Sequence, residues 1–536
     1  MNSKQKKAKS VDTIRNGVTR TQSRKNDKEQ IQKLRNYSPP APIFIALIII
    51  GIIIIIGILN IAPFLYEHHS LENKYSVESI SSNLSNTLND SKPVEVSKIS
   101  FSTGELIPKF AEDNNVYELT SLNSLNQIMV KIDCNEPCKT KINEVEYPAN
   151  QENAIKFDSL NEEEFIKIKV FNDTGSSKEY FVRYLPSTFP KYTVKANSPK
   201  EGQVFFVAFD RRTKKTLDSF IIITDNYANP LFYKKDNTMS DFKKIYTKNG
   251  QEKYVYFSGG KVQFLDSNFN PTEKVSLLPT NKQEGDYYID SHEIYFFDEN
   301  DFVIVAYITK TVRAKVDNSE IEFQVKNAYV QEIKNGEAVW DWDSTDYPEL
   351  YPLSIYADDY NKDTSAAPVD YLHMNSIEID PLDDNFIFSF RHADLVIKVN
   401  RKNGKIIWML GGKGDEFGLN EFQKFSQQHY AKFLPNGYLS IFDNGNTNEE
   451  SRIVEVLLDQ KSKTLLDFKV YYYENHYSSG RGSSQKLDEN TYFIGWGTKR
   501  KIDSAITELN VVSGKMSFEL SFLDEDYITY RAYKIK

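Results

Sequence analysis

Residues 383–408 read DDNFIFSFRHADLVIKVNRKNGKIIW, and this stretch decides the fold class. A polar turn precedes an apolar strand at Phe386–Phe388, and a second apolar alternation begins at Ile397. The tight Asn403-Gly404 turn then leads into a strand that ends at Trp408. Turns of this kind suit β-hairpins, because glycine tolerates a positive φ. The stretch therefore predicts consecutive antiparallel strands joined by short turns.

The same pattern recurs on both sides of this stretch. Its hairpin form returns at residues 330–340, 453–468 and 507–518, and its turn-then-strand form at 297–305, 434–441 and 487–494. The hairpins repeat at roughly 50–70 residues, and four strands per period are typical of a β-propeller blade. Residues 191–536 have room for about six such blades. We therefore predict an all-β fold with a six-bladed β-propeller over residues 191–536.

A different all-β segment precedes this repeat. Short alternating runs at residues 127–132 and 165–170 predict half-buried strands, and residues 172–175 form a turn signal. Their close spacing predicts a small β-sandwich over residues 99–190. The segment has no group of side chains that suggests chemistry, so we expect it to act as a structural or spacing domain.

The chain has only two cysteines, Cys134 and Cys138. Outside the cytoplasm, two nearby cysteines most often form a disulfide, and we predict one here. A metal site would need further ligands, and none is nearby in the sequence. A redox-active pair usually has the spacing Cys-x-x-Cys.

The N-terminal part is charged asymmetrically. Residues 1–36 hold 11 Lys and Arg against 3 Asp and Glu, a net charge of +8, so the whole chain's −9 leaves −17 for the rest. Residues 43–65 are 23 uncharged, Ile-rich residues, which is enough to span a membrane. This run exceeds the core of a cleaved signal peptide and lacks a small-x-small cleavage site.

We therefore expect residues 1–42 to be a basic cytoplasmic tail and residues 43–65 to be a single transmembrane helix in the cell membrane. Residues 66–98 are then a linker rich in Ser, Asn and Glu, and the remainder is extracytoplasmic. A basic tail could also bind nucleic acid, but the adjoining apolar segment favours the membrane. We predict no nucleic-acid partner.

Three of the seven histidines recur at one position of the repeat. His292, His373 and His429 each lie about 8–14 residues before the strand that follows a polar turn. Successive blades place equivalent strand ends around one central channel. We therefore expect the three imidazoles to meet there, as a metal site or as an anion site.

Arg391 favours the anion. It follows the strand at 386–388 in the same blade as His373, and its permanent charge disfavours a divalent cation. The fork of donors on a guanidinium suits sulfate or phosphate. Three histidines with Asp or Glu could still bind zinc. We predict no metal and no cofactor.

At these residues the chain resembles a known family, the bacterial aryl-sulfate sulfotransferases. The resemblance is strong from about residue 285 to 535 and weaker from 99 to 284. The matching segments are Asp370-Tyr371-x-His373-x-Asn375-Ser376, the Ser-x-Arg ending at Arg391, Trp408-x-Leu410-Gly411-Gly412, Gln428-His429, Phe442-Asp443-Asn444-Gly445 and Tyr530-Arg531-Ala532-Tyr533.

The resemblance implies a periplasmic or surface six-bladed propeller preceded by a β-sandwich. It implies an enzyme that moves a sulfuryl group from a phenolic sulfate ester to a phenolic acceptor, without a nucleotide sulfate donor. His429 matches the nucleophile, which becomes sulfated in a ping-pong cycle. His373 and Arg391 match residues that bind and polarise the sulfuryl group, and His292 matches the remaining active-site histidine. Phe390 and Glu378 depart from the family pattern and bear on substrate preference.

Weaker substrate-binding candidates lie near these residues. Asn375 is expected to orient a catalytic side chain, Arg481 to line the substrate entrance, and His476 to border the channel mouth. His392 follows Arg391 directly, so in a strand it should face away and be structural. Trp340 and Trp408 are expected to pack between blades.

Two other functions fit the same pattern. A propeller can act without catalysis, as a surface module that binds an anionic ligand or a protein partner. A hydrolase related to sulfatases would use water as the acceptor. The residues name neither the natural donor and acceptor nor the oligomeric state.

Overall fold

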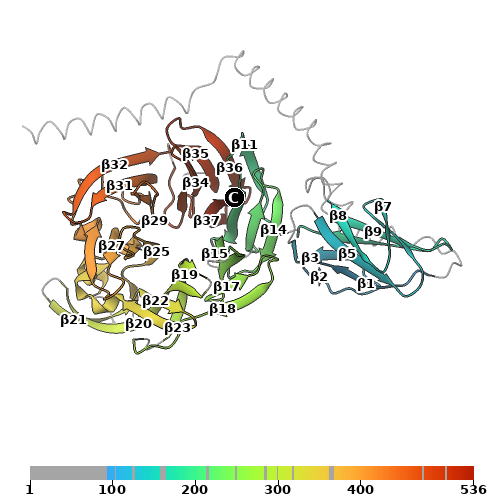
Figure 1. Cartoon of the computed structure of the whole chain (residues 1–536), viewed down its shortest axis with the longest axis horizontal. Coiled ribbons are helices and arrows are strands. Elements are labelled where there is room, and N and C mark those ends of the chain that lie inside the picture. The colour runs from blue at the N-terminus through green and yellow to red at the C-terminus, as the bar shows by residue number, and fades with distance from the viewer. Residues whose placement is uncertain are drawn as a thin grey trace, which may run out of the picture. The chain divides into compact units, whose positions relative to one another are not determined.

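The computed structural model describes residues 93–536 except 103, 123–126, 157–164, 187, 213–216, 248–249, 283–285, 299, 317–318, 361–366, 474–475 and 501–503. This part of the chain consists of strands, turns and short 3₁₀ helices (Figure 1). None of its helices is long and apolar enough to cross a membrane. The expected tail at 1–42, the apolar segment at 43–65 and most of the linker lie outside the described residues. Strand β1 begins at Val96, inside the expected linker.

Two sheets form the first described part, as the alternating runs predicted. Val130 and Ile132 of β5 share one buried core with Ile168 of β9 and Val182 of β10, so the two sheets pack face to face as a β-sandwich. The first sheet contains β1 (Val96–Phe101), β5 (Gln127–Cys134) and β8 (Glu152–Lys156). The second contains β2 (Leu106–Ile107), β3 (Val116–Leu119), β10 (Ser177–Arg183), β9 (Phe165–Phe171), β6 (Lys139–Ile142) and β7 (Val145–Pro148).

The predicted disulfide between Cys134 and Cys138 is present. Cys134 is the last residue of β5 in the first sheet, and Cys138 directly precedes β6 in the second. The bond therefore closes the connection by which the chain passes from one sheet to the other.

Six sheets follow, in a ring of blades numbered 1 to 6 in chain order, and the four main strands of each blade are antiparallel (Figure 1). Blade 1 has β37 (Tyr527–Ile535), β12 (Gln203–Asp210), β13 (Phe220–Thr224) and β14 (Pro230–Lys235), with the short β4 (Ser121–Leu122) at its edge. Blade 2 has β15 (Ser240–Tyr246), β16 (Glu252–Ser258), β17 (Lys261–Leu265) and β18 (Pro271–Val275). Blade 3 has β19 (Tyr287–Asp298), β20 (Asp301–Val316), β22 (Tyr329–Lys334) and β23 (Glu337–Asp343).

The remaining blades complete the ring that the repeat predicted. Blade 4 has β25 (Met374–Ile379), β26 (Phe386–Phe390), β27 (Leu395–Val399) and β28 (Ile406–Leu410). Blade 5 has β29 (His429–Phe433), β30 (Leu439–Asp443), β31 (Arg452–Asp459) and β32 (Thr464–Tyr472). Blade 6 has β33 (Ser483–Lys486), β34 (Thr491–Gly495), β35 (Ile506–Asn510) and β36 (Met516–Phe522), with β11 (Tyr192–Ala196) outside β36.

The predicted hairpins are the outer strand pairs of four blades. They correspond to β22–β23, β27–β28, β31–β32 and β35–β36. Gly336, Gly404 and Gly514 have φ of 79°, 75° and 68°. These are left-handed values that glycine adopts without the steric cost of a Cβ atom.

Two strand pairings between the start and the end of the propeller close the ring. β37, near the C-terminus, pairs with β12 as the inner strand of blade 1. β11 pairs with β36 at the outer edge of blade 6. The first and last blades are therefore each built from both ends of the propeller, so no blade edge is left open between them.

Blade 3 carries an extension that positions part of the site. β20 continues into a hairpin with β21 (Ser319–Lys326), and β21 pairs with β24 (Val369–Asp370) in parallel. The chain between them forms η1 (Ser344–Asp346), η2 (Pro348–Leu353) and η3 (Ala357–Asp359). The other 3₁₀ helices are η4 (Arg391–Ala393) and η5 (Gly412–Gly414).

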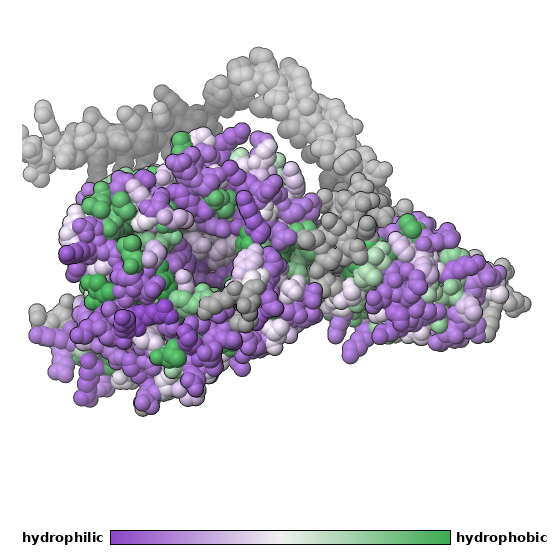
Figure 2. All heavy atoms as spheres, in the orientation of Figure 1, coloured by the Kyte–Doolittle hydropathy of each residue, from purple (hydrophilic) through white to green (hydrophobic). Residues whose placement is uncertain are grey.

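Apolar side chains fill the contacts between blades. Trp408 is fully buried in a core that combines blades 4 and 5, and the Trp340 ring lies 4.8 Å from the Phe386 ring across blades 3 and 4. Both tryptophans therefore pack between blades, as predicted. Figure 2 shows that hydrophilic residues cover most of the visible face, which is hollowed near the middle of the ring.

Candidate active site

The three recurring histidines meet on the first strands of blades 3, 4 and 5. His292 lies in β19 where its register with β20 is irregular, His373 directly precedes β25, and His429 begins β29. The His292 ring centroid lies 5.0 Å from that of His373 and 5.9 Å from that of His429. The expectation that a shared blade position brings these imidazoles together is confirmed.

Each ring is held through its Nδ1 atom. His292 Nδ1 lies 2.8 Å from Asp290 Oδ1, and His373 Nδ1 lies 2.5 Å from Asp370 Oδ2. His429 Nδ1 instead lies 2.7 Å from Asn444 Oδ1. Two histidines therefore have a carboxylate partner, and the third has a neutral amide.

The amide determines the tautomer of His429. Asn444 Nδ2 donates to the carbonyl oxygens of Ser478 and Arg481 at 2.8 and 3.1 Å, so its Oδ1 is an acceptor. His429 Nδ1 must then carry the ring proton, which leaves the lone pair on Nε2. The backbone N–H of Arg481 donates to that Nε2 at 3.1 Å. Burial, followed by the charges of His292 and Arg391, lowers the pKa of His429 well below its ordinary value. His429 is thus a neutral imidazole with a defined nucleophilic nitrogen.

The Asp290–His292 pair is buried and disfavours separated charges. Burial raises the pKa of the Asp290 carboxyl to about 7. Burial and the charge of His373 lower the pKa of His292 well below its ordinary value. The pair therefore holds one proton that it releases near neutral pH, which is the range that suits a general acid or base.

His392 does not face away, and that prediction is wrong. Strand β26 ends at Phe390, and Arg391–Ala393 form η4, so the alternation of a strand does not extend to His392. Its ring lies 4.6 Å from the His373 ring. His392 Nδ1 lies 2.6 Å from the carbonyl oxygen of Asp370, and Nε2 lies 2.6 Å from Arg391 Nη1.

These contacts make His392 a support for Arg391. A carbonyl only accepts, so His392 Nδ1 donates to it and Nε2 accepts from the guanidinium. Burial lowers the pKa of His392 to about 4, in keeping with a neutral ring. Arg391 Nη2 also donates to the carbonyl oxygen of Ser479 at 3.1 Å. Within the described residues no carboxylate forms an ion pair with this guanidinium, so its charge is available to an anion.

The residues do not favour a metal at this place. Asp370, His373 and His392 offer ligand atoms that lie within 4.8 Å of one another. However, Asp370 Oδ2 and His373 Nδ1 bond each other, and both His392 nitrogens have partners, one of which is a guanidinium. A divalent cation would have to displace these bonds beside a fixed positive charge.

Two of the weaker candidates lie in the site. Asn375 is buried, and its Nδ2 donates to the carbonyl oxygen of Gln428 at 2.7 Å, so it holds the residue before His429. Arg481 contacts His429 through its backbone and has φ of 60°. His373 also has a positive φ, 53°. Left-handed backbone at non-glycine residues is costly and is often found at functional sites.

His476 lies in a different environment. Its ring packs 3.9 Å from the Tyr473 ring and 4.9 Å from the Trp496 ring, between blades 5 and 6. None of the ring contacts among the described residues joins it to the three clustered histidines. The structure therefore does not bring His476 together with His292, His373, Arg391 and His429.

Two glycines, Gly412 and Gly445, allow neighbouring backbone segments to approach each other closely. A Cβ atom on Gly412 would lie 2.1 Å from the carbonyl oxygen of Ala393, at the end of η4. On Gly445, next to Asn444, it would lie 1.7 Å from the carbonyl oxygen of Glu450. Both are far inside contact distance, so any side chain here would push apart the loops that carry Arg391 and Asn444.

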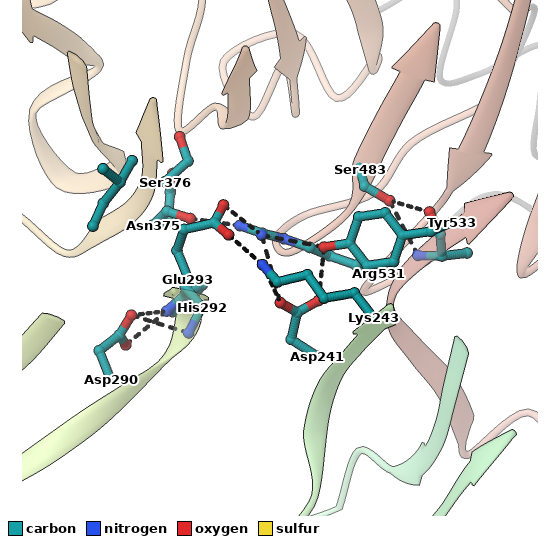
Figure 3. A network of polar contacts seen from close by, with 12 residues as sticks. Asp241, Lys243, Asp290, His292, Glu293, Asn375, Ser376, Ser483, Arg531 and Tyr533 are labelled. Atoms are coloured by element: carbon teal, nitrogen blue, oxygen red, sulfur yellow. Dashed lines mark hydrogen bonds and ion pairs between the residues drawn. The ribbon is translucent and has the colours of Figure 1, made fainter. Parts of the chain in front are cut away.

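A buried ionic network adjoins His292 (Figure 3). Glu293 pairs with Lys243, Lys432 and Arg531 at 2.5, 3.0 and 3.0 Å. Arg531 also donates to the carbonyl oxygen of Asn375 at 2.5 Å, and the Tyr533 hydroxyl donates to Asp241 at 2.7 Å. Ser483 of β33 accepts from Ala532 at 3.1 Å. The network therefore joins the first strands of all six blades directly beside His292.

Sequence reasoning gave no role to Asp290, Asp370 or Asn444, and it gave His392 only a structural one. Asp290, Asp370, Asn444 and His392 had no assigned partner, and their contacts now define the three imidazoles and Arg391. One signal was available: Asp290 lies two residues before His292, and Asp370 lies three residues before His373. Asn444 lies 15 residues from His429 in sequence, and spacing alone does not link them.

Comparison with known proteins identifies similar sequences and structures. Residues 244–523 match the family described as arylsulfotransferase (ASST), and this range covers 280 of the 536 residues. No curated protein matches the chain. A protein of unknown function from Bacteroides caccae has 10% identity and a TM-score of 0.38, over 62% of this chain and 99% of that chain.

Two further solved structures are similar at the same level. An auxiliary nutrient binding protein from Bacteroides ovatus has 10% identity and a TM-score of 0.29, over 82% of this chain and 87% of that chain. The Dos1 propeller has 10% identity and a TM-score of 0.29, over 61% of this chain and 85% of that chain. At these TM-scores the structural likenesses carry no argument about function.

Proposed function

Because the chain belongs to the arylsulfotransferase (ASST) family, we propose that it moves a sulfuryl group from a phenolic sulfate ester to a phenolic acceptor. The transfer passes through a covalent sulfo-histidine at Nε2 of His429 and needs no nucleotide sulfate donor. The observation that carries this proposal is the hydrogen bond from His429 Nδ1 to Asn444 Oδ1, which leaves Nε2 with a lone pair.

The choice of His429 over its two neighbours follows from their partners. A carboxylate beside an imidazole stabilises the cationic ring and so would stabilise an N-sulfo-imidazolium. A neutral amide gives much less stabilisation, so a sulfuryl group on His429 remains easy to transfer. His292 and His373, each bonded to an aspartate, suit proton transfer instead.

In the first half-reaction, Nε2 of His429 gives up the hydrogen bond from the Arg481 N–H. Its lone pair then forms the S–N bond as the bond from sulfur to the phenolic oxygen breaks. Sulfuryl transfer, like phosphoryl transfer, spreads charge over peripheral oxygens, so positioning and electrostatics do most of the work. Arg391 holds those oxygens, together with the neighbouring His373. The proton of the Asp290–His292 pair goes to the departing phenolate.

In the second half-reaction the same pair removes the proton of the incoming phenol. The phenol oxygen attacks sulfur, the S–N bond breaks, and the electron pair returns to Nε2. A phenol ionises near pH 10, so its proton is far easier to remove than that of an aliphatic alcohol. This order of release and binding makes the cycle ping-pong.

Intact-mass measurement after incubation with an aryl sulfate tests the proposal. The wild type is expected to gain one sulfuryl group and to lose it when a phenol is added. His429→Ala is expected to gain none, whereas His68→Ala, outside the described residues, serves as the matched control. Full transfer activity in His429→Ala would show that the mechanism is wrong. Equal turnover with and without added phenol would instead identify a hydrolase.

From the sequence alone we also infer that residues 43–65 anchor the protein in the cell membrane, with the propeller outside. The disulfide between Cys134 and Cys138 supports an oxidising compartment. The full chain is expected to remain in the membrane pellet after an alkaline carbonate wash. Its appearance in the soluble fraction would contradict this inference.

A further inference from the structure

A cavity of about 290 Å³ opens at the same end of the ring as the three histidines. It lies on the other side of the channel, because its walls come from blades 1, 2, 3 and 6, whereas His373, Arg391 and His429 belong to blades 4 and 5. Aromatic and aliphatic side chains and small hydroxyls make up most of the wall, together with one arginine. The lining residues include Phe209, Met239, Phe257, Ile289, Tyr530 and Arg481.

The cavity adjoins the reacting atoms. The Tyr530 ring, which forms part of its wall, lies 5.3 Å from the ring of His292. Arg481 connects it to the nucleophile, because its backbone nitrogen lies 3.1 Å from His429 Nε2 while its side chain lines the cavity. A group bound in the cavity therefore lies next to residues that contact His429 and His292.

The guanidinium of Arg481 is held over two aromatic rings. Its Cζ atom lies 5.2 Å from the Phe209 ring centroid and 5.7 Å from that of Tyr530. Nη1 donates to Thr498 Oγ1 at 2.7 Å, which uses one of its donors. Among the described residues no carboxylate forms an ion pair with Arg481. A buried cation without a counter-ion at the wall of a cavity favours an anionic ligand group.

Resting on the proposed function, we propose that this cavity binds the ring of a phenolic substrate and that Arg481 binds a carboxylate carried by that ring. The substrate class is then a hydroxyaryl carboxylate. The aromatic wall suits the flat ring, and the guanidinium suits the planar carboxylate. The volume lies just below the usual range of about 300–1,000 Å³ for ligand pockets, which suits one ring with a short acidic side chain.

The geometry separates the two arginines. Arg391 belongs to blade 4 and is bonded to His392, on the side of the sulfuryl-binding histidines. Arg481 lies two residues before β33 of blade 6 and is bonded to Thr498, on the side of the cavity. Arg391 therefore binds the group that is transferred, and Arg481 recognises the molecule that carries or receives it.

Acceptor competition tests this assignment. With one aryl sulfate donor, kcat/KM is measured for 4-hydroxyphenylacetate and for its neutral amide, whose phenols are nearly equal in acidity. The wild type is expected to prefer the carboxylate by about tenfold or more, since a charge-assisted hydrogen bond is replaced by a neutral one. Arg481→Met is expected to abolish the preference, Thr498→Val to reduce it, and Arg313→Met, on an exposed hairpin, to leave it unchanged. An equal loss for both acceptors in Arg481→Met would overturn the proposal.

Calorimetric binding separates this proposal from the transfer reaction. 4-Hydroxyphenylacetate alone is expected to bind the full-length wild type and to bind Arg481→Met at least about tenfold more weakly. If the wild type turns over no aryl sulfate but this difference is observed, the proposed function fails and the binding site stands. If the acid binds both proteins equally, or neither, the site is wrong whatever the activity. Thermal unfolding of each variant shows whether it is folded, and Thr498→Val provides a second test if Arg481→Met is not.

Discussion

His429 Nδ1 lies 2.7 Å from Asn444 Oδ1, and this contact distinguishes His429 from the other two histidines of the cluster. His292 and His373 make the equivalent bond to Asp290 and Asp370. One end of the ring thus presents three imidazoles of similar placement but different electrostatic character. The difference lies in the partner atoms, since all three rings occupy equivalent blade positions.

Asn444→Asp is expected to convert His429 into a third carboxylate-bound histidine. The added charge stabilises the cationic ring, so the pKa of His429 rises and the acid limb of sulfo-enzyme formation moves to higher pH. The same charge stabilises the sulfo-histidine, so its transfer to phenol is expected to slow by about tenfold or more. Rapid-quench intact-mass measurement follows both steps.

Asn444→Ala is the control for this substitution, since it also removes the donor bonds to Ser478 and Arg481 but adds no charge. It is expected to slow formation of the adduct without extending its lifetime. If the two variants have the same pH profile, the amide acts only on the loop structure.

The pH dependence is expected to differ between the two half-reactions. Asp290, whose pKa is raised to about 7, must lose its proton before the Asp290–His292 pair can accept one from a phenol. The rate of transfer from the sulfo-enzyme to a phenol should therefore rise between pH 6 and 8, with a midpoint near pH 7. Formation of the adduct from a donor with a good leaving group should be flat over this range, because the lowered pKa of His429 keeps it neutral.

Single-turnover measurements of each half-reaction test this difference. Asp290→Asn is expected to remove the midpoint near 7 from the second half-reaction. If the rates of both half-reactions rise with pH in the same way, the assignment of Asp290 and His292 to proton transfer is contradicted.

His392→Leu is expected to lower kcat/KM for the donor by about tenfold, chiefly through KM. The substitution removes the acceptor that lies 2.6 Å from Arg391 Nη1 and leaves the guanidinium less well placed for the sulfuryl oxygens. His392→Gln is expected to restore much of the loss, since an amide can both accept from Arg391 and donate to the carbonyl oxygen of Asp370. Steady-state kinetics at varied donor concentration measure kcat/KM for each variant. An equal loss of kcat/KM in both variants would exclude a positioning role for His392.

Glu293→Gln is expected to destabilise the fold strongly. Glu293 is buried against Lys243, Lys432 and Arg531, so the neutral amide leaves three cations with too little compensating charge. Removing one partner from a buried ionic group typically costs about 3–5 kcal/mol. The exposed Glu322, paired with Arg313, provides a matched Glu→Gln control with no measurable change expected. Urea unfolding measures both, and equal midpoints would contradict a stabilising role for the network.

The sequence predicted much of the architecture, because strands and hairpin turns are local features. The hairpin at 397–408 corresponds to β27–β28, and the apolar run at 386–388 lies inside β26. The recurrence of His292, His373 and His429 correctly predicted that the three imidazoles meet. The same reasoning was wrong for His392, because it extended the alternation of β26 past Phe390 into a 3₁₀ turn.

Closure of the ring could not be predicted in this way. β37 pairs with β12, and β11 pairs with β36, across more than 300 residues of sequence. The turn signals that mark a hairpin are absent from such pairings. Likewise, Glu293 and Arg531 are 238 residues apart, and no local pattern connects them.

By itself, the sequence determined the strand period, the number of blades, the disulfide partners and the candidates His292, His373, Arg391 and His429. These depend on side-chain periodicity and spacing, which are readable along the chain. Only the tertiary structure decided that Asn444 partners the proposed nucleophile, that His392 supports Arg391, and that Arg481 joins His429 to a cavity. Each of these depends on which atoms the packing of separate blades and loops brings within hydrogen-bond distance, because the chemistry of an imidazole is set by its neighbours in space.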